Sequence, residues 1–305
     1  MEDIKKENMK DASHQALKEA MPDKQKQIKM YNYKLCLSIS ITIFLLTAAA
    51  FGYLIVNDKI NYDIDLKGGL QIVITMANEP DIKQIENILN EFGPVVRSSK
   101  GLTGWSLIIQ TDENVDYNNI ISKLKDVGYD TSNWSVQRMG AVLGKAFLSQ
   151  SIYVLFIAFI FMVATIFYLF RAALPSTFIV FSGAIDIFEA FVFSQLLGIP
   201  LSIATFTGLL LLIGYSVDTN ILLTTRVLRS ETGAVMDRIK LAFKTGMTMI
   251  ATSIVAVLVL FFISGSQMIM HIAAVLVIGL FCDIINTWLT NASLIQIYAK
   301  RKGMV

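Results

Sequence analysis

The sequence predicts an α-helical membrane protein with six transmembrane helices and one small α+β, ferredoxin-like extracytoplasmic domain between the first and second helix. Of its 305 residues, 54% are hydrophobic and only 16% are charged, whereas a soluble domain carries about 25% charged residues. Six apolar runs approach the roughly 20 residues that cross a hydrocarbon core. Only one internal stretch, residues 57–145, is long and polar enough to fold in water.

The apolar runs set the six predicted spans and the segments between them. The spans cover residues 35–56, 146–170, 175–197, 201–223, 247–264 and 268–297. The fifth is short and the sixth is long, so their tilts should differ. The first is too long for a signal peptide and is interpreted as an uncleaved anchor. A polar tail, residues 1–34, precedes it, and a short tail, residues 298–305, closes the chain.

Basic residues in the short connections predict the orientation in the membrane. They are Lys24, Lys26, Lys29 and Lys34 before the first span, Arg171 after the second, Arg226, Arg229, Arg238, Lys240 and Lys244 after the fourth, and Lys300, Arg301 and Lys302 at the end. All of them lie on one side if both termini are cytoplasmic. The sequence therefore predicts a multi-pass plasma-membrane protein with residues 57–145 outside.

The outer segment alternates strand-like and helix-like patterns. Strands are expected at 70–76, 94–98, 105–110 and 134–138, and helices at 81–92 and 117–127. The order β-α-β-β-α-β is that of the ferredoxin-like split βαβ fold. That fold alone implies no function, and so small a core favours gripping or docking over chemistry.

The connection between the fourth and fifth spans has two open interpretations. Residues 224–246 are predicted to form a basic cytoplasmic loop. Within them, over residues 226–246, apolar residues alternate with basic ones. This stretch could form an amphipathic helix on the inner membrane surface. It could equally be a solvated loop whose basic residues only set the orientation.

Four acidic side chains fall inside the predicted spans, and no Lys or Arg lies within those spans to neutralise them. They are Asp186, Glu189, Asp218 and Asp283. A charge at a helix centre costs at least ~2.5–3.5 kcal/mol and commonly marks an ion or proton path. Hydrogen bonds that only pack helices together are the alternative for each acid. Asp218 is the first choice for ion handling.

The spacing of these acids predicts which neighbours share their helix faces. Asp186 and Glu189 are three apart and face the same way, and at that separation one of the two should keep a proton. Asp218 shares a face with Gly214 and Tyr215, and Asp283 shares one with Gly279 and Asn286. A small residue beside a polar one is typical of close helix contact in a bilayer.

Several function classes find no support in the sequence. The chain has two histidines, His14 and His271, and no nucleophile-plus-base arrangement, so no catalytic residues are predicted. No metal-ligand spacing and no nucleotide motif occur, so neither a metal nor a cofactor is expected. A net charge of +2 does not indicate nucleic acid. Energy for any work should come from an ion gradient or from a partner.

Three motifs resemble the SecD/SecF protein-export family. Asp65-Leu-Lys-Gly68-Gly69-Leu, just after the first span, resembles the Asp-hydrophobic-x-Gly-Gly signature of the family. From chemistry alone this stretch is a turn that leads into a strand. Asp186-Ile resembles the His-Asp-hydrophobic step of the third span. The residues that resemble the fourth-span motif are Gly214, Tyr215, Ser216, Asp218, Asn220 and Arg226.

The length of the chain, with one small outer domain and six spans, fits the SecF branch rather than SecD. Three departures from the bacterial pattern look archaeal. The acid of the fourth span is shifted by one position to Asp218, Leu228 stands where the pattern is basic, and Asp283 stands where it is small and uncharged.

The resemblance implies a function and partners. The chain should pair with SecD in an assembly of the resistance-nodulation-division type beside the SecY translocon. There it should hold unfolded secretory polypeptide, contact membrane lipid and draw on the proton gradient. A small-molecule or lipid exporter of the same superfamily is the main alternative. A scaffold whose acids only pack helices is the other.

Overall fold

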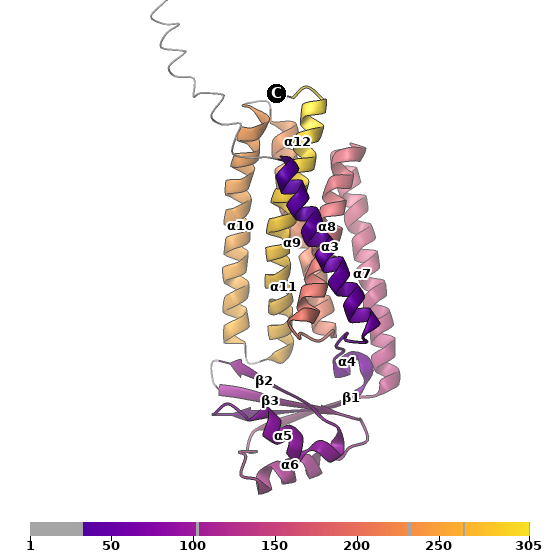
Figure 1. Ribbon diagram of the computed structural model, residues 1–305, viewed down its shortest axis with the longest axis vertical. Helices are drawn as coiled ribbons and strands as arrows, with labels where there is room; N and C mark the ends of the chain where they lie inside the picture. Colours follow the sequence, from indigo (N-terminus) through magenta and orange to yellow (C-terminus); the bar gives the residue numbers. More distant parts are fainter. Residues whose placement is uncertain (1–32, 102–103, 231–232, 265, 305) are drawn as a thin grey trace, which may run out of the picture.

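The computed structural model describes residues 33–101, 104–230, 233–264 and 266–304. Within them, long helices form a bundle, and a small α+β domain sits at one end of it (Figure 1). The predicted polar tail lies outside these residues except for its last two positions. The interpretation of Lys24, Lys26 and Lys29 as orientation signals therefore falls on undescribed residues.

Six helices in the described residues are long and apolar enough to cross a membrane, as the sequence predicts. They are α3 (Tyr33–Val56), α7 (Ala141–Phe170), α8 (Ala173–Leu196), α9 (Ile203–Arg229), α10 (Val235–Ile263) and a last rod made of α11 (Gln267–Ile285), the π-helical turn η2 (Asn286–Asn291) and α12 (Ala292–Arg301).

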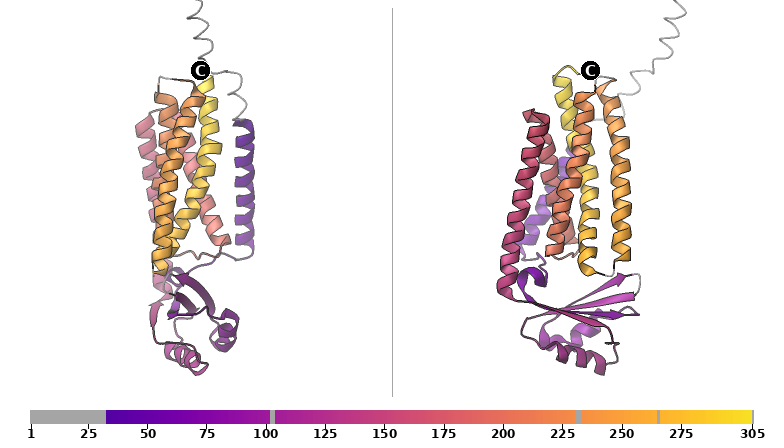
Figure 2. Two further views of the ribbon diagram at one scale, coloured as in Figure 1. Left: turned by 90° about the vertical axis from the view of Figure 1, so that its left-hand side faces the viewer. Right: turned by 180° about the vertical axis from the view of Figure 1, so that it is seen from behind.

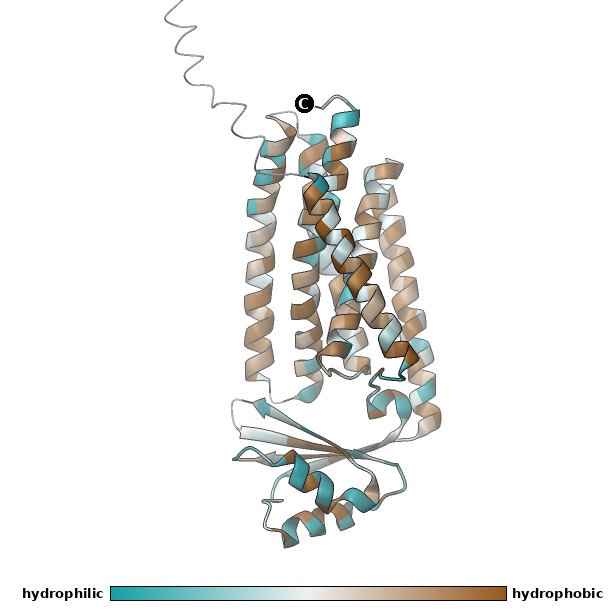
Figure 3. Ribbon diagram, in the orientation of Figure 1, coloured by the Kyte–Doolittle hydropathy of each residue, from teal (hydrophilic) through white to brown (hydrophobic). Residues whose placement is uncertain are grey.

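The six helices divide into a central and a peripheral set. Half of the most apolar window of α8 and of α9 is buried, against 17% for α3, 11% for α7 and 17% for α10. Figures 1 and 2 show α3 crossing the outside of the bundle. There the ring of Phe51, on α3, packs edge to face against the ring of Phe188, on α8. Figure 3 shows that the outer helices are largely hydrophobic along their length, as lipid contact requires.

The α+β domain has the predicted order of elements. They are β1 (Gly69–Met76), α5 (Ile82–Ile88), the 3₁₀ turn η1 (Asn90–Phe92), β2 (Val95–Gly101), β3 (Gly104–Thr111), α6 (Tyr117–Asp126) and β4 (Trp134–Met139). All pairs in the sheet are antiparallel, and the strand order is β2-β3-β1-β4. The helices cover the sheet face that points away from the bundle (Figure 1). The prediction of a small ferredoxin-like domain is confirmed.

The opposite face of the sheet docks on the bundle through polar contacts. The side-chain amide of Gln110 donates to Asp63 Oδ1 at 2.5 Å and to Gln71 Oε1 at 2.7 Å. Gln71 in turn donates to Gln267 Oε1, in the first turn of α11, at 3.2 Å. Near α3, the backbone N–H of Asp63 donates to the carbonyl of Leu201 at 2.8 Å. The domain is thus fixed to the bundle by hydrogen bonds and by an apolar cluster in which Leu66 packs with Leu201 and Phe206.

The structure agrees only in part with the helical interpretation of residues 226–246, and it does not form one continuous loop there. α9 continues to Arg229, and α10 already begins at Val235. Val227, Val235 and Ile239 are buried in one apolar cluster that also includes residues of α12. These apolar positions pack against neighbouring helices rather than lying on a membrane surface, because extending both helices buries them. Only a short connection separates the two helices.

The Asp65–Gly69 signature brings two backbones close together. It overlaps the short helix α4 (Ile64–Lys67), which packs on the start of α7. Gly68 has a φ of +83°, and a Cβ there would lie 2.5 Å from Ala141 Cα. A Cβ on Gly144 of α7 would lie 2.9 Å from the backbone of Leu66 and of Gly68. The signature is therefore a turn, as its chemistry predicts, and also a point of close backbone approach.

Substituting Gly144 with Ala should destabilise this junction. The added methyl group meets backbone, which cannot move aside, so we expect a loss of about 1–3 kcal/mol, as for overpacking. Thermal unfolding of the detergent-purified chain measures it. Gly52→Ala is the matched control, because Gly52 also lies in a helix and nothing lies within 4 Å of a Cβ there. Equal unfolding temperatures for the two variants would contradict the prediction.

Candidate functional site

Three of the four predicted acids lie together at the centre of the bundle. Asp186 and Glu189 come from α8 and Asp283 comes from α11, and each side chain is 0% exposed. Asp186 and Asp283 lie close enough to interact electrostatically. No basic side chain among the described residues forms an ion pair with any of the three. The negative charge of this site is therefore balanced by neutral donors alone or by protons.

Neutral side chains supply hydrogen bonds to two of the acids from two directions. The hydroxyl of Ser216, on α9, donates to Asp186 Oδ2. From η2, the amide of Asn286 donates to Asp186 Oδ1 and to Glu189 Oε2, each at 2.8 Å. Both acids of α8 therefore face Asn286, as their three-residue spacing predicts.

The third acid has its own donors. The hydroxyl of Thr287 donates to Asp283 Oδ1 at 2.8 Å, and the amide of Asn220 donates to the same oxygen at 3.5 Å. Asn291 donates to Asn220 Oδ1 at 2.6 Å. We call this set the acid cluster, and its members are Asp186, Glu189, Ser216, Asn220, Asp283, Asn286, Thr287 and Asn291.

The acid cluster has more acceptors than donors. Four of its buried oxygens have no hydrogen-bond partner among the described residues, namely Glu189 Oε1, Asp283 Oδ2, Asn286 Oδ1 and Asn291 Oδ1. A buried acceptor without a donor costs about 1–3 kcal/mol. A proton on a carboxyl group turns one acceptor into a donor, so taking up protons relieves this shortage.

The sequence indicated part of this cluster and missed part of it. Ser216 and Asn220 belong to the fourth-span motif, and Asn286 was placed on the same face as Asp283. Thr287 and Asn291 were missed. Their signal is the stretch from Asn286 to Asn291, in which four of six residues are polar, inside a span that is mostly apolar. A regular α-helix would spread these side chains around its axis, but the wider π-helical turn buries both ends of the run.

Asp218 lies apart from the other three acids. Its side chain is exposed, as are Gly214 and the 40% exposed Tyr215 on the same face of α9. The helical period explains the separation, because Ser216 and Asn220 point inward and Asp218, between them, points outward. Asp218 lines an open groove of about 580 Å³, with Ile221 and Leu222 of α9 and Met249 of α10 among the other lining residues.

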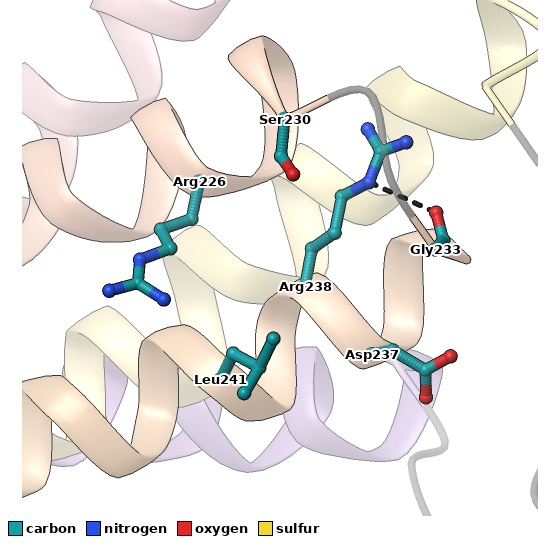
Figure 4. Close-up of a pocket in the computed structure, with 6 residues that line it drawn as sticks. All are labelled: Arg226, Ser230, Gly233, Asp237, Arg238 and Leu241. Atoms are coloured by element: carbon teal, nitrogen blue, oxygen red, sulfur yellow. Dashed lines mark hydrogen bonds between the residues drawn. The ribbon is translucent and has the colours of Figure 1, made fainter.

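The last residue of the fourth-span motif, Arg226, also lines this groove and, in addition, a pocket of about 270 Å³. Figure 4 shows the guanidinium groups of Arg226 and Arg238 pointing in different directions around this pocket. Arg238 donates to the carbonyls of Gly233 and Val227, each at 3.1 Å. The two cations therefore do not converge on a common anion.

Asp65, Gly68 and Gly69 of the first signature lie at the junction with the α+β domain, where the α4 turn leads directly into β1. Burial, with the nearby charge of Asp63, raises the pKa of Asp65, and a hydrogen bond from Gln137 at 3.0 Å partly opposes this. A raised pKa in the folded state means that the ionised form costs stability at neutral pH.

Replacing Asp65 by Asn should therefore remove the loss of folding stability that arises when the Asp65 carboxyl ionises, which happens only as the pH rises. Below the pKa of an unfolded Asp, about 3.9, wild type and variant should unfold at similar temperatures. Above it, the variant should become the more stable of the two. Fluorescence of Trp105 and Trp134 in this domain reports the unfolding.

Asp130→Asn is the control with the opposite sign, because hydrogen bonds from Ser132 lower the pKa of Asp130. A stability difference at Asp65 with the same sign as that at Asp130 would contradict the prediction.

Comparison with known proteins identifies the family. Residues 119–301 match the family described as protein export membrane protein SecD/SecF, C-terminal. SecF of Methanocaldococcus jannaschii is 36% identical over 276 residues, which cover 88% of this chain and 96% of the relative. SecF of Pyrococcus furiosus is 35% identical over 278 residues, which cover 90% and 92%.

A solved structure shares the fold. The translocon-associated membrane protein SecDF from Thermus thermophilus superimposes with a TM-score of 0.73 and 18% identity. The match covers 89% of this chain and 39% of that protein, so the present chain corresponds to about two fifths of SecDF.

These matches agree with the resemblance of the motifs and with the six spans. They place the chain among transport membrane proteins rather than enzymes. The chain belongs to the SecD/SecF family, as a multi-pass protein-export membrane protein of the SecF type.

Proposed function

We propose that this chain pairs with a SecD subunit beside the SecY translocon and assists the export of unfolded secretory polypeptides by using the proton gradient. The observation that carries this proposal is the acid cluster. Three buried carboxyl groups meet without a basic partner among the described residues. Intramembrane acids of this kind are typical of proton relays.

The unpaired oxygens of the cluster support protons as the coupled ion. Protonating Glu189 or Asp283 supplies a donor where an unpaired carboxyl oxygen now lies. Loss of that proton restores the mismatch of acceptors and donors. The two states therefore differ in hydrogen bonding among α8, α11 and η2. A difference of this kind is what a proton-driven conformational change requires.

The exposed face of α9 supports SecD as the partner. An acid such as Asp218 is costly against lipid and normally faces protein or water. Gly214 lies one turn away, and nothing lies within 4 Å of a Cβ built on it. A bare glycine beside a polar residue suits close packing with another transmembrane helix. The remaining outer surfaces, on α3, α7 and α10, suit membrane lipid.

The positions of the connections support cytoplasmic termini. The α7–α8 and α9–α10 connections and the C-terminus lie at the end of the bundle opposite the α+β domain (Figures 1 and 2). Basic residues gather at this end, among them Arg171, Arg226 and Lys300. The positive-inside rule then puts this end in the cytoplasm and the α+β domain outside.

The α+β domain suits the holding of polypeptide. Its edge strand β4 is largely exposed, including Trp134 at 42%. An extended chain can add to such an edge by main-chain hydrogen bonds, which are independent of sequence. A protein that assists export must bind secreted polypeptides of many different sequences.

Copurification together with an export assay tests the proposed function. Cells that lack the chain should export a secreted reporter slowly and recover on re-expression, and the tagged chain should copurify with SecD and SecY. Homotrimers with bound lipid and no SecD would favour the exporter alternative. The scaffold alternative predicts that neutral substitutions of the acids alter assembly and leave export unchanged.

A further inference from the structure

Asn286 connects the two acids of α8. Its two amide hydrogens are both used, one on Asp186 Oδ1 and one on Glu189 Oε2. For Glu189 it is the sole hydrogen-bond donor among the described residues, and Glu189 Oε1 has none. For Asp186 it shares the task with Ser216. Any change in the position of this amide therefore alters the hydrogen bonding of both carboxyl groups at once.

The position of Asn286 depends on the π-helical turn. Three other side chains of η2 tie this turn to its neighbours. Thr290 makes a hydroxyl–hydroxyl contact with Ser40 on α3, Thr287 donates to Asp283, and Asn291 donates to Asn220 on α9. π-helical turns are rare and are frequent at functional sites. Two of these contacts reach separate helices, α3 and α9, and the third reaches Asp283 in the preceding turn of the same rod. Together they hold Asn286 against α8.

The surroundings of Asn286 leave no other charged group to take over its role. The titratable groups that face it are Asp186 and Glu189 of α8, and Asp283 with its neighbour Cys282 of α11. α9 contributes the neutral Ser216 and Asn220, and α3 contributes the neutral Ser40. The balance between ionised and protonated carboxyls on α8 thus depends on this amide, with Ser216 as the second donor to Asp186.

We propose that Asn286 is a positioning residue for proton handling, and that the π-helical turn exists to present its amide to Asp186 and Glu189 together. When both carboxyls are ionised, each uses one hydrogen of the amide. When one carboxyl takes up a proton, it accepts that hydrogen bond more weakly, and the hold of the turn on α8 is loosened. The inference rests on the proposed proton coupling, but its test does not require export.

Infrared spectroscopy of the full-length chain in lipid nanodiscs tests the inference. The carbonyl stretch of protonated carboxylic acids is followed through a pH titration in wild type and in Asn286→Leu, which keeps the size of the side chain and removes its donors. The titration midpoint of the band should shift by about one to two pH units, the effect of losing a hydrogen bond to an ionised group. More of the band should persist at neutral pH.

Two further variants distinguish this role from simple packing. Ser182→Ala alters buried packing on α8, one turn from Asp186, at a hydroxyl that has no hydrogen-bond partner among the described residues, so its band should titrate as in wild type. In the double variant Asn286→Leu with Glu189→Gln, the shift should become smaller, because one of the two affected carboxyls is gone. An unchanged titration in Asn286→Leu, or an equal shift in Ser182→Ala, would overturn the inference. A shifted titration in Asn286→Leu with unchanged export would instead count against the proposed function and leave the inference standing.

Discussion

An Asp186→Asn variant is expected to reach the membrane at the normal level and to support little export of a secreted reporter. Asn has nearly the shape of Asp and can still accept the hydrogen bond from Ser216, but it cannot carry a proton. Losing an essential proton-transfer group commonly slows a reaction by roughly 10²-fold or more. We expect an effect of this size on the gradient-dependent part of export.

The assay compares pulse-labelled reporter outside cells that carry wild type or variant, with membrane level and SecD association measured in parallel. Ser182→Ala is the matched control, because Ser182 is buried on the same helix and its hydroxyl has no hydrogen-bond partner among the described residues. That variant should export normally. If Asp186→Asn exports at the wild-type rate, Asp186 is not an essential proton carrier.

An Asp218→Leu variant is expected to fold normally and to lose association with SecD. The side chain is exposed on α9, so its removal leaves the acid cluster intact. A polar contact between transmembrane helices contributes about 1–2 kcal/mol, which corresponds to a roughly tenfold weaker association. Copurification of SecD at rising detergent concentration, normalised to the amount of variant in the membrane, measures this loss.

Gly214→Leu should give the same result, because it adds bulk to the same face where nothing in the chain opposes it. Gly52→Leu, on α3, is the matched control and should leave the association unchanged.

The Asp218→Asn variant distinguishes a role in SecD association from a role in proton transfer. Slow export with normal SecD association would return Asp218 to the proton path, as its place in the fourth-span motif first predicts. Normal export and association would leave it without a role in either process.

Sequence patterns predicted most of the architecture for clear physical reasons. Each span must be continuously apolar, because lipid offers no hydrogen bonds to the backbone. The strands and helices of the α+β domain follow from periods of two and 3.6 residues. The connection around residues 226–246 was the exception. Val227, Val235 and Ile239 look amphipathic in sequence, but contacts with α12, distant in the chain, draw them into the bundle.

The sequence by itself determined the six spans, the βαββαβ domain and the presence of uncompensated acids in the membrane. Only the tertiary structure decided which acids act together. Asp186, Glu189 and Asp283 meet because α8 and α11 pack side by side, whereas Asp218 points outward between two inward residues of α9. The π-helical turn then changes the direction of Asn286 and Asn291. Helical period fixes the faces within one helix, but only packing between helices decides which faces meet.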